Sequence, residues 1–499
     1  MNKERSSSKI LLGVAGLLAL IQVLFSDFIG TPFGGYADQR IVLSVIPVFL
    51  IFGFIFSCAR YGAVSLSTVA KVLFPTLLLC LSYLVSALPF QSQPYVWVEP
   101  VMYTFFFLAM VASGASLSWA VASISYSKIL VLIIASTCLL YGLASINVYL
   151  FAIIDGVTKL TDFIPWGFVN IRYWSHIATW CLHLMPLAVL VGPLKNIRSW
   201  RIAVLLGAGM WWWILFLTTG RGSALGIIFG VTFAGLLFGR RALPWLKVFS
   251  IYLATGFVIW LVLSVVIPSF MADGVQVRTI KADSSGRMSL FAEAWQMSLK
   301  NFPFGMGPQS WLTHTPITEA YANGQKFGHP HNMYLMWAAE YGWLLIAAMA
   351  LVVVQAIRNF WRRRAELFET EDPEQLLLLA GFTASVSAAL FHAGMSAVFM
   401  APGSMLVGMF VLIGFWAMIE PAPVMATGRR RSKPNPKARI VIGALVAAAI
   451  ALVWALWANE VWQYYKDMRA DEPYYFEHES EGTLPRFWFH GNFPRDVQQ

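Results

Sequence analysis

Charged residues are scarce in this chain of 499 residues. Asp, Glu, Lys and Arg together make up 12% of it, whereas hydrophobic residues reach 58%. Soluble globular chains usually carry about a quarter of charged residues, so this composition excludes that class. The sequence therefore indicates a polytopic membrane protein of the all-α class.

Several motifs that carry chemistry are also missing. The sequence has no Walker A motif, no Asp-x-Asp pair and no Cys/His cluster with metal-ligand spacing. Its four cysteines lie in or beside apolar segments, so no disulfide is expected in the long polar loop described below. We therefore expect a reaction that uses no metal and no cofactor, with arginines supplying the positive charge.

Apolar stretches of about 20 residues, the length needed to cross a bilayer core of about 30 Å, are abundant. They predict about thirteen transmembrane helices, at residues 10–27, 41–57, 65–88, 97–120, 129–154, 173–192, 202–219, 222–238, 245–267, 331–356, 376–396, 402–419 and 440–458.

The basic residues predict the orientation of these helices. Short loops rich in Lys and Arg stay cytoplasmic. When the N-terminus is placed in the cytoplasm, the loops rich in these residues fall on the cytoplasmic side along the chain. The net charge of +10 is then mainly a topology signal, and nucleic-acid binding is not implied. Thirteen spans place the C-terminus on the outer side.

Loop lengths predict the organisation of the chain. One outer loop is long and polar, and it contains an amphipathic segment from Met288 to Lys300 with Phe291, Trp295 and Leu299 at four-residue spacing. This segment either lies on the membrane surface or shapes a substrate groove. The predicted parts are helices 1 to 9 (1–268), the outer loop (269–330), helices 10 to 13 (331–458) with a basic linker (420–439), and a C-terminal tail (459–499).

Arg221 is a candidate for binding an anion. It lies in a short turn between two apolar helices, where an arginine is costly unless it reaches water or a partner. Gly220 and Gly222 leave the backbone amides uncovered at the start of the next helix, which favours phosphate binding. Snorkelling of Arg221 to the surface is the alternative interpretation.

Arg287 is a second candidate, because it follows Ser284-Ser285-Gly286 and precedes the amphipathic segment. The predicted topology puts it on the same side of the membrane as Arg221 and Arg172. Paired charge-assisted hydrogen bonds from a guanidinium suit a diphosphate.

His331 is the candidate general base. It follows His329-Pro330 at the entry of an apolar helix, and a neutral imidazole can take a proton from an attacking sugar hydroxyl. The remaining polar groups of the apolar segments, His176, His183, Glu340 and His392, are interpreted mainly as packing residues.

Over residues 165–420 the chain resembles the O-antigen ligase and Wzy polymerase superfamily of bacterial envelope glycosyltransferases. Three groups of residues carry this resemblance: Thr219-Gly220-Arg221-Gly222, Ser285-Gly286-Arg287 leading to Pro303-Phe304-Gly305-Met306-Gly307, and His329-Pro330-His331-Asn332 continuing to Glu340-Tyr341-Gly342. The ligase-type pattern has a second glycine where this chain has Leu345.

The resemblance implies a GT-C-like fold in the bacterial inner membrane, with a cavity open to the periplasm. Positions matching Arg221 and Arg287 hold the diphosphate of an undecaprenyl-diphosphate-linked glycan, and His331 matches the position that activates the acceptor hydroxyl. We also expect substrate binding by Arg172, His329, Asn332, Gly220 and Gly222.

The sequence leaves the acceptor open. A ligase transfers the glycan to the lipid A–core saccharide, a Wzy-type polymerase to a second lipid-linked glycan, and a related protein O-oligosaccharyltransferase to Ser or Thr of a protein. A lipid-linked sugar flippase is an alternative of a different class. The scarcity of charges within the apolar segments and the lack of internal repeats argue against it.

Overall fold

The computed structural model describes residues 2–30, 32–61, 66–157, 159–271, 286–324, 327–422, 436–478 and 486–488. Within these ranges every regular element is a helix and none is a strand. This confirms the predicted all-α class. Apolar runs form helices because a helix satisfies its backbone N–H and C=O groups internally. Ser284, Ser285 and most of the basic linker lie outside the described residues.

Eleven stretches among the described residues are long and apolar enough to cross a membrane. One of them, Arg221–Phe270, contains two helices in series, α9 (Arg221–Phe238) and α10 (Leu243–Leu261). The chain is therefore a multi-pass membrane protein. The total of thirteen spans stays a prediction.

Packing divides the chain into two compact units. Unit 1 contains residues 1–39, 122–283 and 364–418, and unit 2 contains residues 40–121, 284–363 and 419–499. Two long helices, α2 (Gly35–Tyr61) and α15 (Met333–Thr370), contribute residues to both units. The division by loop length that the sequence suggested stays a prediction.

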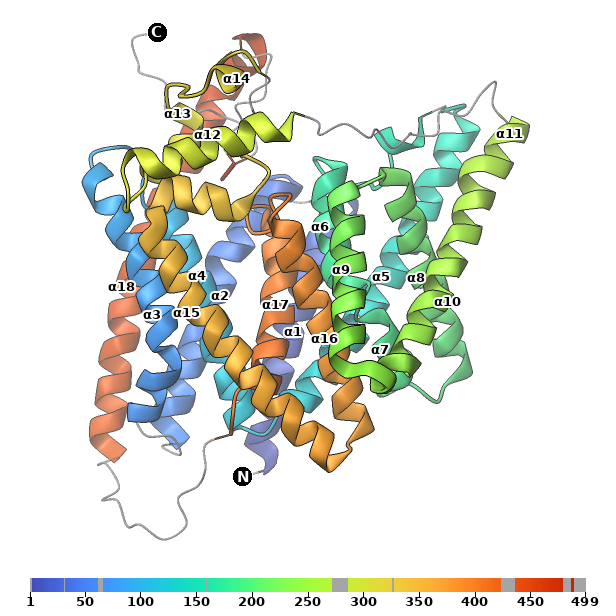
Figure 1. Cartoon of the computed structure of the whole chain (residues 1–499), viewed down its shortest axis with the longest axis horizontal. Coiled ribbons are helices and arrows are strands. Elements are labelled where there is room, and N and C mark those ends of the chain that lie inside the picture. Colours follow the sequence, from blue (N-terminus) through green and yellow to red (C-terminus); the bar gives the residue numbers. More distant parts are fainter. Residues whose placement is uncertain are drawn as a thin grey trace. The chain divides into compact units, whose positions relative to one another are not determined.

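Unit 1 is a bundle in which α9 packs along α16 (Figure 1). Gly226 and Gly230 allow the close approach, because a Cβ on Gly230 would meet the carbonyl oxygen of Ala384 at 2.3 Å. Besides α9 and α10, the unit contains α1 (Asn2–Ile29), α5 (Ser123–Ile154), α6 (Ile171–Cys181), α7 (Met185–Leu190), α8 (Arg198–Thr218), α11 (Ile267–Met271), α16 (Pro373–Ala393) and α17 (Pro402–Ile419).

Unit 2 combines long apolar helices with the short helices of the segment after Ser285. The long helix α18 packs against α4, and α12 packs against α14. The elements are most of α2, α3 (Leu66–Ala87), α4 (Val98–Trp119), α12 (Arg287–Lys300), α13 (Ser310–Thr313), α14 (Glu319–Ala322), most of α15, and α18 (Pro436–His478).

Several predicted elements have different bounds in the structure; α15, for example, ends at Thr370 and not at residue 356. The window 173–192 is broken, since α6 ends at Cys181 and α7 begins at Met185 with Pro186 in its first turn. The last helix continues from the predicted end at residue 458 to His478, so the first 20 residues of the predicted tail are helical. The amphipathic segment is a helix as predicted, α12.

Candidate functional site

Arg172 and Arg221 lie in the first turns of α6 and α9 in unit 1. The two turns are neighbours, because a Cβ on Gly220 would lie 3.7 Å from the side chain of Ser175. Asn170 caps α6, its Oδ1 accepting the backbone N–H of Arg172 at 2.9 Å. Two helix N-termini and the arginines of their first turns thus lie at one end of unit 1, which favours anion binding.

The glycines beside Arg221 have packing roles. Atoms of the His392 ring lie 3.0 Å from the position of a Cβ on Gly222. At Gly220 the crowding atom is the hydroxyl oxygen of Ser223, 2.5 Å away, and this hydroxyl donates to the carbonyl oxygen of Gly220 at 2.7 Å. Packing therefore gives a reason for Gly222, whereas the Ser223 hydroxyl beside Gly220 can rotate away, and the predicted part of both glycines in substrate binding stays a prediction.

Next to this turn lies a buried polar cluster whose histidines were interpreted from the sequence mainly as packing residues. Nε2 of His176 lies 2.8 Å from the hydroxyl oxygen of Ser396, and Nδ1 of His392 lies 3.0 Å from that of Thr179. The two imidazole rings are 5.0 Å apart and nearly perpendicular. The sequence shows that α6 and α16 each carry polar residues within apolar segments. It does not show that these residues contact one another.

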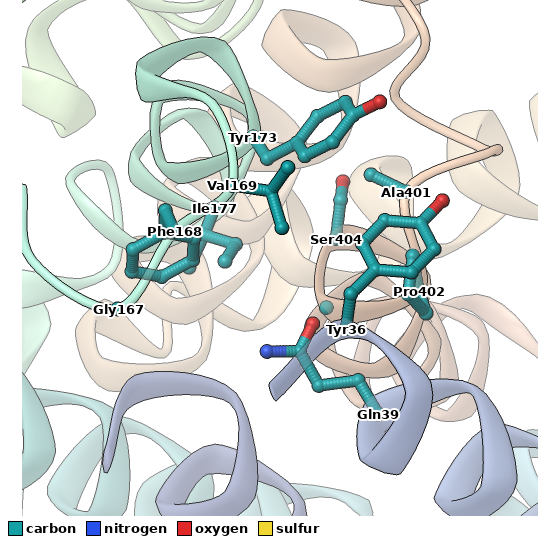
Figure 2. Close-up of a pocket in the computed structure, with 11 residues that line it drawn as sticks. Tyr36, Gln39, Gly167, Phe168, Val169, Tyr173, Ile177, Ala401, Pro402 and Ser404 are labelled. Atoms are coloured by element: carbon teal, nitrogen blue, oxygen red, sulfur yellow. The ribbon is translucent and has the colours of Figure 1, made fainter. Parts of the chain in front are cut away.

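A pocket in unit 1 opens next to Arg172 along the chain, because Tyr173 lines it (Figure 2). Its empty volume is about 280 Å³, open solvent included. The rings of Tyr36 and Tyr173 lie 5.8 Å apart, and the amide of Gln39 donates to the carbonyl oxygen of Val23 at 3.3 Å. Ser404, at the start of α17, supplies a further polar group.

In unit 2, Arg287 is the first residue of α12 and follows Gly286, whose φ of +70° suits glycine. The buried side of α12, which includes Leu290, Ala294 and Met297, packs into a core with Trp311 and Tyr321. Trp295 and Leu299, from the apolar row seen in the sequence, are each 44% exposed. These two residues of the apolar row therefore lie outside this core, and the ring of Trp295 contacts that of Trp343 on α15, with centroids 5.5 Å apart. Whether the row lies on the membrane or shapes a groove stays a prediction.

Glu293, on the buried side of α12, was missed by sequence reasoning. Its carboxylate accepts hydrogen bonds from Nε2 of His314, from the amide of Ile317, and from the amide and hydroxyl of Thr318, at 2.5–2.8 Å. Burial alone would raise the pKa of Glu293, but these hydrogen bonds leave it below its ordinary value. Glu293 therefore fastens the loop after α13 to α12.

The sequence predicted a helix that begins at His331, but in the structure His331 lies before the helix. The first helical residue of α15 is Met333, and Asn332 caps it, its Oδ1 accepting the amides of Tyr334 and Leu335 at 3.0 and 3.1 Å. His331 has a positive φ of +59°, which is uncommon for residues other than glycine and clusters at functional sites. Its backbone N–H donates to Nδ1 of His329 at 3.0 Å, and the two rings lie 4.3 Å apart.

The segment Pro303–Gly307 packs into a break of α15. Gly342 interrupts the helix with a φ of +82° and a ψ of 176°, and a Cβ there would meet the carbonyl oxygen of Pro303 at 2.1 Å. The amides of Met306 and Gly307 donate to the carbonyl oxygens of Ala339 and Glu340 at 2.8 and 2.9 Å. These contacts give a physical reason for two motifs of the sequence, Pro303-Phe304-Gly305-Met306-Gly307 and Glu340-Tyr341-Gly342.

The predicted site residues thus form two groups. Unit 1 brings Arg172, Gly220, Arg221 and Gly222 together, and unit 2 brings His329, His331 and Asn332 together and contains Arg287. That the two groups meet around one substrate stays a prediction.

A comparison with protein families gives a match over part of the chain. No curated protein matches the chain. Residues 202–350 match the family described as O-Antigen ligase, and this range includes Arg221, Arg287 and His331. The resemblance to the O-antigen ligase and Wzy polymerase superfamily is therefore confirmed over residues 202–350.

Proposed function

We propose that the protein is a glycosyltransferase that moves a glycan from an undecaprenyl-diphosphate carrier to an acceptor hydroxyl at the periplasmic face of the inner membrane. The observation that carries the proposal is the O-antigen ligase match over residues 202–350, which contains both candidate arginines and the candidate base. Transfer to lipid A–core is the favoured reaction, because the matching family is described as a ligase.

Donor binding is assigned first to Arg221. Its guanidinium and the amides in the first turns of α6 and α9 favour the negative charge of a diphosphate, and Arg172 adds a second cation at the same end of unit 1. Arg287 is assigned to the same diphosphate. The positive charge stabilises the undecaprenyl diphosphate as it leaves.

His331 is assigned the role of general base. The acceptor oxygen forms a bond to the anomeric carbon of the glycan, and the bond from that carbon to the diphosphate oxygen breaks. The hydroxyl proton passes to the imidazole, a step that typically contributes about 10²–10⁴-fold in rate. The products are the glycosylated acceptor and free undecaprenyl diphosphate, and we assign the charge stabilisation to the arginines.

A reconstituted transfer assay tests this proposal. Purified protein is incubated with lipid-linked oligosaccharide and, separately, with lipid A–core, a second lipid-linked glycan, or a Ser/Thr-containing protein, without metal or ATP. Ligase chemistry predicts glycosylated lipid A–core. Product on another acceptor reassigns the protein to the polymerase or protein-transferase type. Movement of the donor across liposomes with no product on any acceptor contradicts the proposal and favours a flippase.

A further inference from the structure

Three residues near the end of the chain are buried within unit 2. Arg486, Phe487 and Trp488 are 3%, 0% and 1% exposed. The guanidinium of Arg486 donates to both carboxylate oxygens of Glu99 on α4, at 2.8 and 2.7 Å, and to Glu340 on α15 at 2.5 Å. The segment therefore joins two helices that are far apart in the sequence.

The backbone and rings of this segment are bound as well. Arg40 donates to the carbonyl oxygens of Arg486 and Phe487 at 3.1 and 3.0 Å, and its guanidinium lies 4.6 Å from the ring centroid of Phe487. Phe487 stacks on Tyr464 of α18. Unit 2 thus provides a pocket that fits one arginine and the aromatic residue after it.

Loss of Arg486 would unbalance the charges of a buried cluster. The cluster contains two carboxylates, Glu99 and Glu340, and two guanidinium groups, Arg40 and Arg486, all at most 3% exposed. Removing one partner of a buried ion pair leaves an uncompensated charge in a medium that solvates it poorly. Without Arg486, the carboxylate of Glu340 would have to move or take a proton.

Glu340 is also connected to His331 through a series of contacts. Its Oε1 accepts the amide of Trp311 at 3.1 Å, and the indole N–H of Trp311 donates to the carbonyl oxygen of Phe327 at 2.8 Å. The ring of Phe327 lies edge-on to that of His331, with centroids 5.2 Å apart. A continuous series of contacts within unit 2 therefore links Arg486 to the candidate base.

We propose that Arg486 is a positioning residue for His331, with the C-terminal segment acting as an internal ligand of the pocket formed by Glu99 and Glu340. This inference rests on the proposed function for its effect on transfer. Its structural part, the fixed environment of the His331 ring, can be measured without any activity.

The test compares Arg486→Met with Arg469→Met in the full-length protein. Arg469 forms an exposed ion pair with Glu472 on α18 and is the matched control. Diethyl pyrocarbonate acylates accessible imidazoles, and mass spectrometry reads each histidine separately. His331 is 4% exposed in the parent protein. We expect its acylation rate to rise about threefold or more in Arg486→Met and to stay unchanged in Arg469→Met.

A second readout is transfer, measured well below the thermal midpoint of each variant. We expect Arg486→Met to lower kcat with little change in the donor KM, and Arg486→Lys, which keeps one charge, to restore part of it. If Arg486→Met does not accumulate, Arg486→Lys serves both readouts. Parent-like acylation of His331 in the accumulating variant overturns the proposal, whereas an inactive parent protein contradicts the proposed function alone.

Discussion

Arg221 and Arg287 share an unusual local setting. Each is the first residue of a helix and follows a glycine, although a cation near a helix N-terminus is unfavourable by about 0.3–1 kcal/mol. An anion bound at such a position removes this cost, because it interacts favourably with both the guanidinium and the helix. The two positions therefore match the demands of a diphosphate ligand.

Replacing either arginine with lysine keeps the charge but removes the planar fork of donors. We expect Arg221→Lys and Arg287→Lys each to lower transfer by about 10- to 100-fold, the effect of losing a hydrogen bond to a charged group. Membrane abundance should stay normal. Steady-state kinetics at varied donor concentration measure the effect, and near-parental rates in both variants would remove the diphosphate assignment.

Glu293 makes the stability of the segment around α12 depend on pH. Because its pKa in the folded protein is lowered, its contribution is present above the ordinary carboxyl pKa and is lost as the pH falls through the folded value. We expect Glu293→Gln to lower the free energy of unfolding at pH 7 by about 1–3 kcal/mol, because two backbone amides lose a charged acceptor.

Thermal midpoints measured between pH 7 and pH 3.5 test this expectation. The parent protein should lose stability at the acid end, and Glu293→Gln should lose less. Glu319→Gln, at an exposed position of α14, is the control and should behave as the parent. Parallel curves for all three proteins would show that Glu293 does not carry the acid sensitivity.

At the scale of elements, the contact of α9 with α16 depends on small residues. Gly230 faces the backbone of α16, whereas Gly235 on the same helix has its nearest neighbour, Leu246, at 3.9 Å. We expect Gly230→Ala to destabilise the protein by about 1–3 kcal/mol through overpacking. Gly235→Ala should be neutral or slightly stabilising, because alanine favours helix. Equal thermal midpoints for the two variants would contradict the close packing described above.

Elements were predictable from the sequence where hydrophobicity alone determines them. The apolar windows and the helix from Met288 to Lys300 follow from the length and period of apolar residues. The break between α6 and α7 was not predicted, because apolar residues continue through it. Gly342 lies in an apolar helix by sequence, and its break becomes apparent only when Pro303 packs against it.

At the scale of the whole molecule, contacts between distant residues limited what sequence could predict. Arg486 and Glu99 are separated by 387 residues, and no local pattern marks either as a partner. The candidate site residues Arg221, Arg287 and His331 were proposed from motifs and lie in the matched range, and their roles stay predictions. The roles of His392 beside Gly222 and of Glu293 required the fold.

The predicted topology makes one claim about the whole chain. Basic loops place the N-terminus in the cytoplasm, and thirteen spans place the end of the chain in the periplasm. We expect a periplasm-active phosphatase fused after Gln499 to be active and the same enzyme inserted near Lys433 to be inactive. Reversed activities would contradict the shared compartment that the proposed site requires.

The most direct measurement concerns His331. His331→Asn suits the left-handed backbone, because asparagine adopts it readily, and it removes the base without a large change in volume. His329→Asn is the matched control. Donor binding and transfer at saturating donor are measured on the same reconstituted preparations across pH. We predict that His331→Asn binds donor as the parent does but loses transfer by about 10²-fold or more, together with the acid limb of the pH–rate profile. His329→Asn should be milder. Near-parental transfer by His331→Asn, or an unchanged acid limb in its residual activity, would contradict the account.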